Sequence, residues 1–118
     1  NKFEIIQVLR GKPFTSKNIV EAKDKNNLIW HPGVYVFYGN ERVWKVGRHL
    51  TNSRKRANQH INDNTHTEKH CIKDLEKITD AELILFNIIK QEDYHWVAAV
   101  EIYLEEKLKP LIPSKRTG

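Results

Sequence analysis

The sequence of 118 residues contains no methionine and a single cysteine, Cys71. One cysteine excludes an intramolecular disulfide, and a reducing compartment is then the default, so we expect a cytoplasmic protein. No apolar run approaches the roughly 20 residues that a membrane-spanning helix needs. The first residues also lack the pattern of a signal peptide. We therefore expect no membrane partner.

The chain begins at Asn1, without a methionine, which indicates a trimmed piece of a longer protein. A fused partner domain or a homodimer is therefore a possible assembly. Internal repeats and low-complexity tracts are absent. The length suits one domain with a modest core. With 39% apolar and 30% charged residues, the composition is that of a globular chain rather than a disordered one.

Acidic residues are missing from residues 42–60, although this stretch holds six cations: Arg42, Lys45, Arg48, Arg54, Lys55 and Arg56. The rest of the chain has 14 cations against 15 acids, so the whole positive excess lies here. Clustered positive charge favours a polyanion, and a phosphate backbone is the usual one. The sequence thus favours a nucleic-acid partner over the alternative of a solvated basic surface.

Two short runs before and within this stretch predict an antiparallel hairpin. Residues 34–38 are all β-branched or aromatic, and residues 42–46 are nearly so. Gly39 and Asn40 between them tolerate the positive φ of a tight turn. Residues 82–89 read as a buried third strand. The sequence therefore predicts an α+β fold with a small three-stranded antiparallel sheet flanked by helices.

Helical signals follow the hairpin. Asn52 or Ser53 can cap a helix in which Arg56 and His60, four residues apart, share a face. A short helix is expected within residues 69–78, and a longer one over residues 93–109. Residues 1–32 form an N-terminal arm, either a lid over the core or a substrate-contacting extension. Its apolar segment at residues 3–9 is compatible with strand or helix.

Glu101 interrupts an apolar stripe, because Val97, Glu101, Leu104 and Leu108 follow helical spacing. A carboxylate directed at a core is costly unless something pairs with it. A divalent cation would satisfy this one, and Mg²⁺ commonly uses one or two carboxylates while keeping several waters. A salt bridge to a basic neighbour or an exposed edge position is the alternative.

The motifs G-V-Y at residues 33–35 and K-V-G at residues 45–47, followed by Arg56, His60 and Glu101, resemble the core of the GIY-YIG nucleases. The resemblance covers residues 33–118, which it marks as a catalytic domain. It implies an endonuclease that hydrolyses DNA phosphodiester bonds with the help of Mg²⁺ or Mn²⁺.

The resemblance also implies a role for each site residue. Tyr35 would be the general base on the attacking water, and Lys45, which stands in place of the second motif tyrosine, would activate it or contact the phosphate. Arg56 would stabilise the developing negative charge, and His60 would assist proton transfer. Glu101 would hold the metal ion.

Tyr35 and Lys45 meet only in one hairpin register. A three-residue loop at residues 39–41 sets Tyr35 opposite Lys45, whereas a two-residue loop sets it opposite Trp44 or Val46 and turns Lys45 to the other face. The catalytic hypothesis requires the three-residue loop, and the sequence leaves both open. In that register the ammonium group would lower the pKa of the phenol.

Arg48, Arg54 and Lys55 are the expected contacts to the nucleic-acid backbone. Two rival functions are a non-catalytic nucleic-acid-binding module derived from a nuclease fold and a protein-interaction domain with a basic face. A zinc site is a further alternative, with His66, His70 and Cys71 as its candidate ligands. The sequence lacks the second pair of ligands that such a site normally has.

Overall fold

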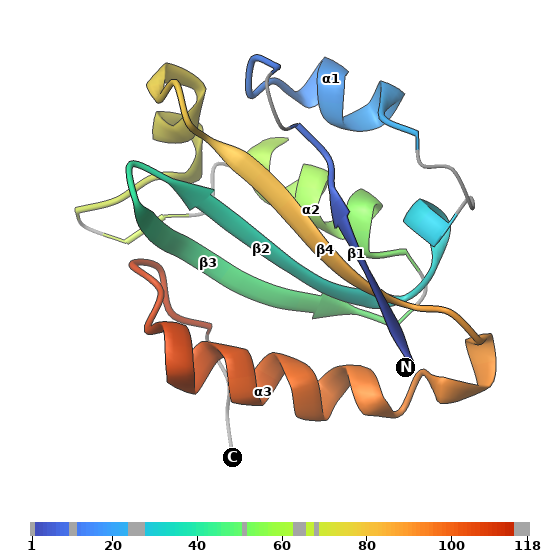
Figure 1. Ribbon diagram of the computed structural model, residues 1–118. Coiled ribbons are helices and arrows are strands. Elements are labelled where there is room, and N and C mark those ends of the chain that lie inside the picture. The colour runs from blue at the N-terminus through green and yellow to red at the C-terminus, as the bar shows by residue number, and fades with distance from the viewer. Residues whose placement is uncertain are drawn as a thin grey trace.

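The computed structural model describes residues 2–9, 12–23, 28–50, 52–62, 66–67 and 69–114. Its centre is an antiparallel sheet of four strands in the order β1-β4-β2-β3 (Figure 1). The strands are β1 (Phe3–Gln7), β2 (Gly33–Gly39), β3 (Arg42–His49) and β4 (Glu82–Ile88). The predicted α+β class and antiparallel sheet are confirmed. The predicted count of three strands is wrong, because β1 from the N-terminal arm pairs with β4.

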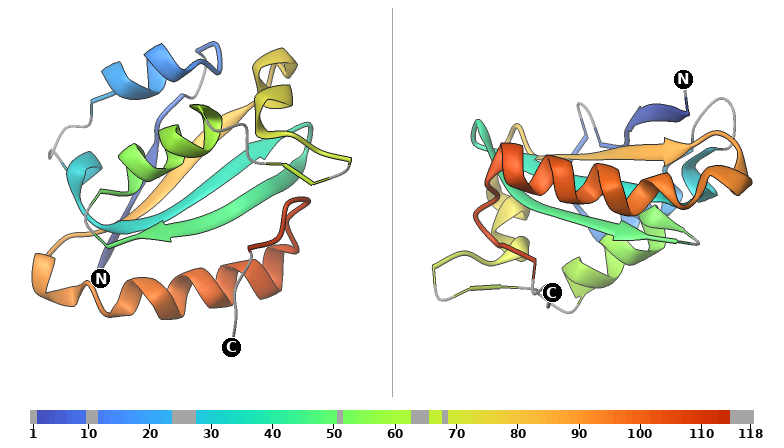
Figure 2. Two further views of the ribbon diagram at one scale, coloured as in Figure 1. Left: turned by 180° about the vertical axis from the view of Figure 1, so that it is seen from behind. Right: turned by 90° about the horizontal axis from the view of Figure 1, so that it is seen from below.

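Helices pack on both faces of the sheet. They are α1 (Ser16–Glu21), α2 (Ser53–Asn62) and α3 (Trp96–Leu108), with short 3-10 turns η1 (Leu28–Trp30), η2 (Ile72–Lys77) and η3 (Gln91–Asp93). Figures 1 and 2 show α1 and α2 on one side and α3 on the other, alongside β3. Among the described residues, no helix combines the length and the apolar character needed to cross a bilayer.

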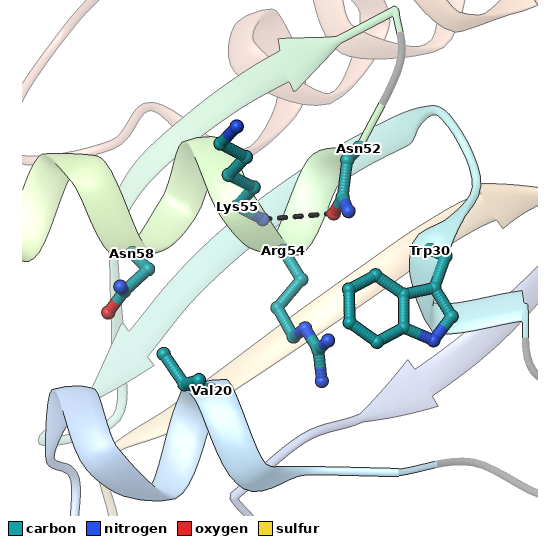
Figure 3. A pocket seen from close by; sticks show the side chains of 6 residues that line it. All are labelled: Val20, Trp30, Asn52, Arg54, Lys55 and Asn58. Carbon is teal, nitrogen blue, oxygen red and sulfur yellow. Dashed lines mark hydrogen bonds between the residues drawn. The ribbon is translucent and has the colours of Figure 1, made fainter.

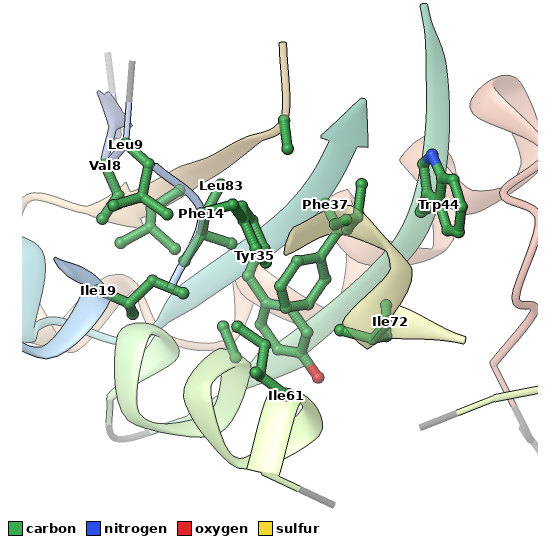
Figure 4. Close-up of a cluster of buried hydrophobic side chains, with 14 of the residues drawn as sticks. Val8, Leu9, Phe14, Ile19, Tyr35, Phe37, Trp44, Ile61, Ile72 and Leu83 are labelled. Atoms are coloured by element: carbon green, nitrogen blue, oxygen red, sulfur yellow. The ribbon is translucent and has the colours of Figure 1, made fainter. Parts of the chain in front are cut away.

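The central strand β2 is apolar throughout because both of its faces are covered. Tyr35 and Phe37 pack with Ile61 of α2 in the larger core cluster, whereas Val34 and Val36 pack with Val97 of α3 in a second cluster. Figure 4 shows the larger cluster, with the hydroxyl of Tyr35 at its margin. The sheet thus separates two small cores.

The hairpin between β2 and β3 turns on two residues. Asn40 and Glu41 have φ values of 53° and 60°, and Gly39 pairs directly with Arg42. Two successive left-handed residues match the right-handed twist of the flanking strands. Asp80 supports the turn, because its carboxylate accepts hydrogen bonds from the backbone N–H of Asn40 (2.7 Å) and of Glu41 (3.3 Å). The three-residue loop that the catalytic hypothesis required is wrong.

A β-bulge nevertheless returns Lys45 to the face of Tyr35. Tyr38 pairs with Val43 but Phe37 pairs with Lys45, so Trp44 is the extra residue on β3. Beyond the bulge Tyr35 lies opposite Gly47, and not opposite Lys45 as expected. Directly opposed residues share a face of the sheet. Lys45 and Tyr35 are therefore diagonal neighbours on the face that α2 covers.

Candidate active site

The ring of Tyr35 lies across Gly47 of the neighbouring strand. A Cβ atom at Gly47 would overlap both Oη and Cζ of the phenol. Because β3 is the last strand of the sheet, this crossing brings the hydroxyl of Tyr35 towards the sheet edge while the ring stays buried. The glycine of the K-V-G motif therefore makes room for the tyrosine of the G-V-Y motif.

Helix α2 brings a histidine to that hydroxyl. Asn52 caps the helix, since its Oδ1 accepts a hydrogen bond from the backbone N–H of Lys55 (3.0 Å), as one of the two predicted caps. Ala57 and Ile61 then bury one face of α2 against the sheet. His60 lies next to Ile61 in α2, and its Nε2 is 2.6 Å from Oη of Tyr35. The two rings pack with their centroids 5.5 Å apart.

Burial raises the pKa of Tyr35 well above its ordinary value of 10. The charge and hydrogen bond of Arg56 act in the opposite direction, and the charge of Glu101 raises the pKa further. The net effect is a protonated phenol at neutral pH. The expected lowering of this pKa below its ordinary value is wrong, because the register differs from the one it assumed and the loss of hydration outweighs the lowering by Arg56.

Burial also lowers the pKa of His60, to about 4, and the positive charges of Lys45 and Arg56 add to this effect. His60 is therefore neutral at pH 7. A neutral imidazole has one acceptor nitrogen, so the O–H group of Tyr35 donates to Nε2 of His60 in the tautomer that carries its proton on Nδ1. Tyr35 and His60 form a neutral pair surrounded by cations.

Lys45 is buried, with 6% of its surface exposed, although it carries a flexible charged side chain. Its charge acts on His60. The structure therefore brings Lys45 into the same cluster as Tyr35, His60 and Arg56.

Glu101 reaches the cluster from the opposite side of the sheet edge. It is 5% exposed on α3, next to the buried Val97, as its position in the apolar stripe predicted. Nη1 of Arg48 donates to its Oε1 at 3.4 Å, so the salt-bridge alternative is present. The carboxylate is also close enough to Tyr35 for its charge to raise the pKa of the phenol. A hydrogen bond or a charge effect therefore connects each of the five predicted catalytic residues with Tyr35 or His60.

The side chains of this site suit a metal ion that is held by one carboxylate and otherwise by substrate and water. Within the described residues, no group of three or more His, Cys, Asp and Glu side chains is arranged around a common point. Mg²⁺ is commonly held by one or two carboxylates together with substrate phosphates and waters. Glu101 fits this mode. His70 instead packs edge-on against Trp44, 5.6 Å between ring centroids, and His66 and Cys71 form a β-bridge.

The three predicted backbone contacts have different environments. Lys55 is exposed on α2, and Arg48 forms a salt bridge with Glu101. Arg54 is 4% exposed, donates a hydrogen bond to the carbonyl of Ala22, and lies over the ring of Trp30, 4.0 Å from its centroid. Arg54 therefore holds α1 and η1 against α2.

His49 belongs to the site but was not among the predicted residues. Its Nδ1 accepts a hydrogen bond from the backbone N–H of Asn52 (2.8 Å). Burial lowers its pKa, and the charges of Arg56 and Lys55 lower it further. The sequence signal that could have indicated His49 is its position at the end of β3, just before Asn52, which caps α2. Gly47 and Trp30 were also missed, because their roles depend on neighbours from other elements.

Comparisons of the chain with protein-family models, with curated proteins and with solved structures find no match. The resemblance to GIY-YIG nucleases therefore depends on the motif residues and on their order and spacing in the sequence.

Proposed function

We propose that this protein is a metal-dependent endonuclease that hydrolyses DNA phosphodiester bonds. The observation that supports this most is the 2.6 Å hydrogen bond between Tyr35 and His60. Arg56 and Lys45 act on this pair with positive charge, and Glu101 acts with negative charge. A neutral proton relay between cations and one carboxylate suits attack on a phosphodiester anion.

In the proposed reaction, a water molecule attacks phosphorus and gives its proton to Oη of Tyr35. The phenol passes its own proton to Nε2 of His60 at the same time, so Tyr35 never has to exist as a free phenolate. The bond between phosphorus and the sugar oxygen breaks, and that oxygen takes a proton from solvent. His60 finally releases its proton to solvent. This relay uses the protonation states that burial favours in both groups.

Arg56 and Lys45 bind the phosphoryl oxygens as negative charge builds on them. A guanidinium fork matches the geometry of two such oxygens. One preorganised donor of this kind is typically worth about 10²–10³ in rate. Burial lowers the pKa of His60, and the same two cations lower it further in the absence of substrate. They therefore prepare the proton acceptor as well as the binding site.

Glu101 would hold Mg²⁺ or Mn²⁺, and the cation would have to share or displace the 3.4 Å contact between its Oε1 and Arg48. A divalent cation bound there would stabilise the negative charge that develops during hydrolysis.

Replacing Glu101 tests the proposal. We expect wild-type protein to nick plasmid DNA with Mg²⁺ and to stop when a chelator is added. Glu101→Ala should abolish nicking while DNA binding, measured by fluorescence anisotropy, survives. Glu101→Gln keeps the shape of the side chain and separates loss of charge from loss of packing. Normal nicking by a folded Glu101→Ala variant would overturn the metal role.

A non-catalytic nucleic-acid-binding module is the second candidate. Two observations favour it: Lys45 replaces the second motif tyrosine, and Arg48 occupies an oxygen of Glu101. DNA binding without cleavage in either Mg²⁺ or Mn²⁺ would support this module over the enzyme. A cytosolic location belongs to both proposals, since the chain has a single cysteine.

A further inference from the structure

A pocket of about 150 Å³ opens between α1, α2 and η1 (Figure 3). Two cations, two amides, an indole and one aliphatic side chain line it, and none of the six is acidic: Val20, Trp30, Asn52, Arg54, Lys55 and Asn58. It lies on the face of α2 that meets α1, and none of the five proposed catalytic residues lines it. The pocket combines positive charge with an aromatic surface.

Arg54 and Trp30 form a stacked wall of this pocket. Arg54 is 4% exposed, and a hydrogen bond to the carbonyl of Ala22 holds its guanidinium over one face of the indole. Trp30 remains 56% exposed. An aromatic ring held in place while half in solvent is a stacking surface for a nucleobase, because every base has a π-face.

Two amides add polar groups. Asn58 accepts a hydrogen bond from the hydroxyl of Ser16 at Oδ1 (2.6 Å), and Asn52 uses its Oδ1 to cap α2. With their oxygens engaged inside the protein, each amide has its NH₂ group as the donor for a ligand. Carbonyl oxygens and ring nitrogens of bases are matching acceptors.

The size of the pocket limits the ligand. Small-molecule sites usually enclose about 300–1,000 Å³, so this pocket takes only part of a larger molecule. One base of a strand is such a part. A base paired inside a duplex is stacked on both sides and cannot enter, so the base has to be unpaired.

Helix α2 connects the pocket with the proposed cleavage site. Lys55 lines the pocket and Arg56 contacts Tyr35, and the charges of both act on His49. The two sites lie on different faces of one helix, whose diameter with side chains is about 10–12 Å. This span equals about three steps of 3.4 Å along one strand of DNA.

We infer that this pocket receives one unpaired base of the strand that is cut, and this inference rests on the proposed nuclease function. The preferred substrate is then DNA with a single-stranded or distorted position a few nucleotides from the cleaved bond. Phosphate contacts at Arg56 and Lys55 hold the strand, and Trp30 with Arg54 holds the base.

Binding to abasic DNA tests the inference. A single-stranded oligonucleotide and an abasic strand of equal length carry the same phosphates and differ only in their bases. We expect the wild-type protein, with chelator present to prevent cleavage, to bind the base-containing strand about 5- to 150-fold more tightly. Equal affinity for both strands would overturn the inference.

Three variants assign the effect to the pocket. Trp30→Ala should remove the preference for bases, and Val20→Glu, at an exposed position, should do the same by adding a charge without removing packing. Trp96→Ala is the control, because Trp96 is also exposed but lies on α3. A preference that persists in both pocket variants, or that is lost only in the Trp96 variant, would contradict the pocket.

Cleavage assays separate this inference from the proposed function. A protein that prefers bases in a pocket-dependent way but cuts no DNA would overturn the nuclease and support the base site. A protein that cuts DNA in Mg²⁺ without any preference for bases would support the nuclease and overturn the base site. If both hold, a duplex with one unpaired base should be cut faster than its fully paired counterpart.

Discussion

Tyr35 and His60 show how burial decides protonation in this site. The low-dielectric surroundings disfavour charge on either group, so the pKa of the phenol rises and that of the imidazole falls to about 4. Lys45 and Arg56 reinforce the shift of His60, and Arg56 opposes that of Tyr35. The pair is therefore a neutral donor and acceptor at pH 7, which suits a proton relay better than a phenolate base.

His60 should make stability depend on pH. Its folded pKa of about 4 lies below its ordinary value of 6.5. Between these values the unfolded chain binds more protons than the folded one, so the free energy of unfolding should fall as the pH drops from 6.5 towards 4. The slope is at most about 1.4 kcal/mol per pH unit, and solvent screening of the partly exposed ring reduces it.

Chemical denaturation of wild-type protein and of His60→Gln between pH 4 and 7 measures this effect. The slope of the wild type should exceed that of the variant over this range. His95→Gln, at an exposed histidine, is the control and should keep the wild-type slope. A titration of His60 near 6.5, followed by NMR, would contradict the prediction.

At the scale of the element, strand β3 prepares the site with two local features. The bulge at Trp44 turns Lys45 to the face of Tyr35, and Gly47 leaves space for the phenol. The side chain of Trp44 supports the bulge, because its Nε1 donates to the carbonyl of Gly39 (2.9 Å). The backbone irregularity and the missing side chain in this strand therefore both serve the arrangement around Tyr35.

Gly47→Ala tests the fit between β3 and Tyr35. The new methyl group overlaps the ring, so we expect a loss of about 1–3 kcal/mol in the free energy of unfolding, as for overpacking in a core. DNA nicking should fall with it because the hydroxyl of Tyr35 is displaced from His60. In a Tyr35→Ala background the same substitution should cost much less. An equal cost in both backgrounds, measured by urea unfolding, would assign the effect to the strand instead.

Over the whole molecule, the positive excess of residues 42–60 is not one uniform surface. The fold pairs Arg48 with Glu101, buries Lys45 and Arg54, and leaves Lys55 exposed. The net charge of +5 suits attraction to DNA. Individual cations of the cluster nevertheless have different roles, which charge counting cannot separate.

Lys55→Ala should weaken DNA binding by reducing the salt-dependent part of the affinity, which comes from phosphate contacts. Loss of one phosphate contact lowers the slope of log affinity against log salt concentration by about 0.9. Anisotropy titrations at several salt concentrations measure it, with Lys107→Ala on α3 as a control that should leave the slope unchanged. An unchanged slope for Lys55→Ala would show that this lysine does not contact phosphate.

Local patterns in the chain were enough to predict the hairpin, the strand near residues 82–89, a helix cap at Asn52 or Ser53, the shared face of Arg56 and His60, and the position of Glu101 in an apolar stripe. Each depends on a period of two or 3.6 residues or on capping, which act over a few neighbours. Four outcomes needed the assembled fold: β1 as a fourth strand, the bulge that sets Tyr35 opposite Gly47, the buried position of Arg54, and the opposite pKa shifts of Tyr35 and His60. Pairing register, burial and desolvation depend on residues distant in sequence, so tertiary structure alone decides them.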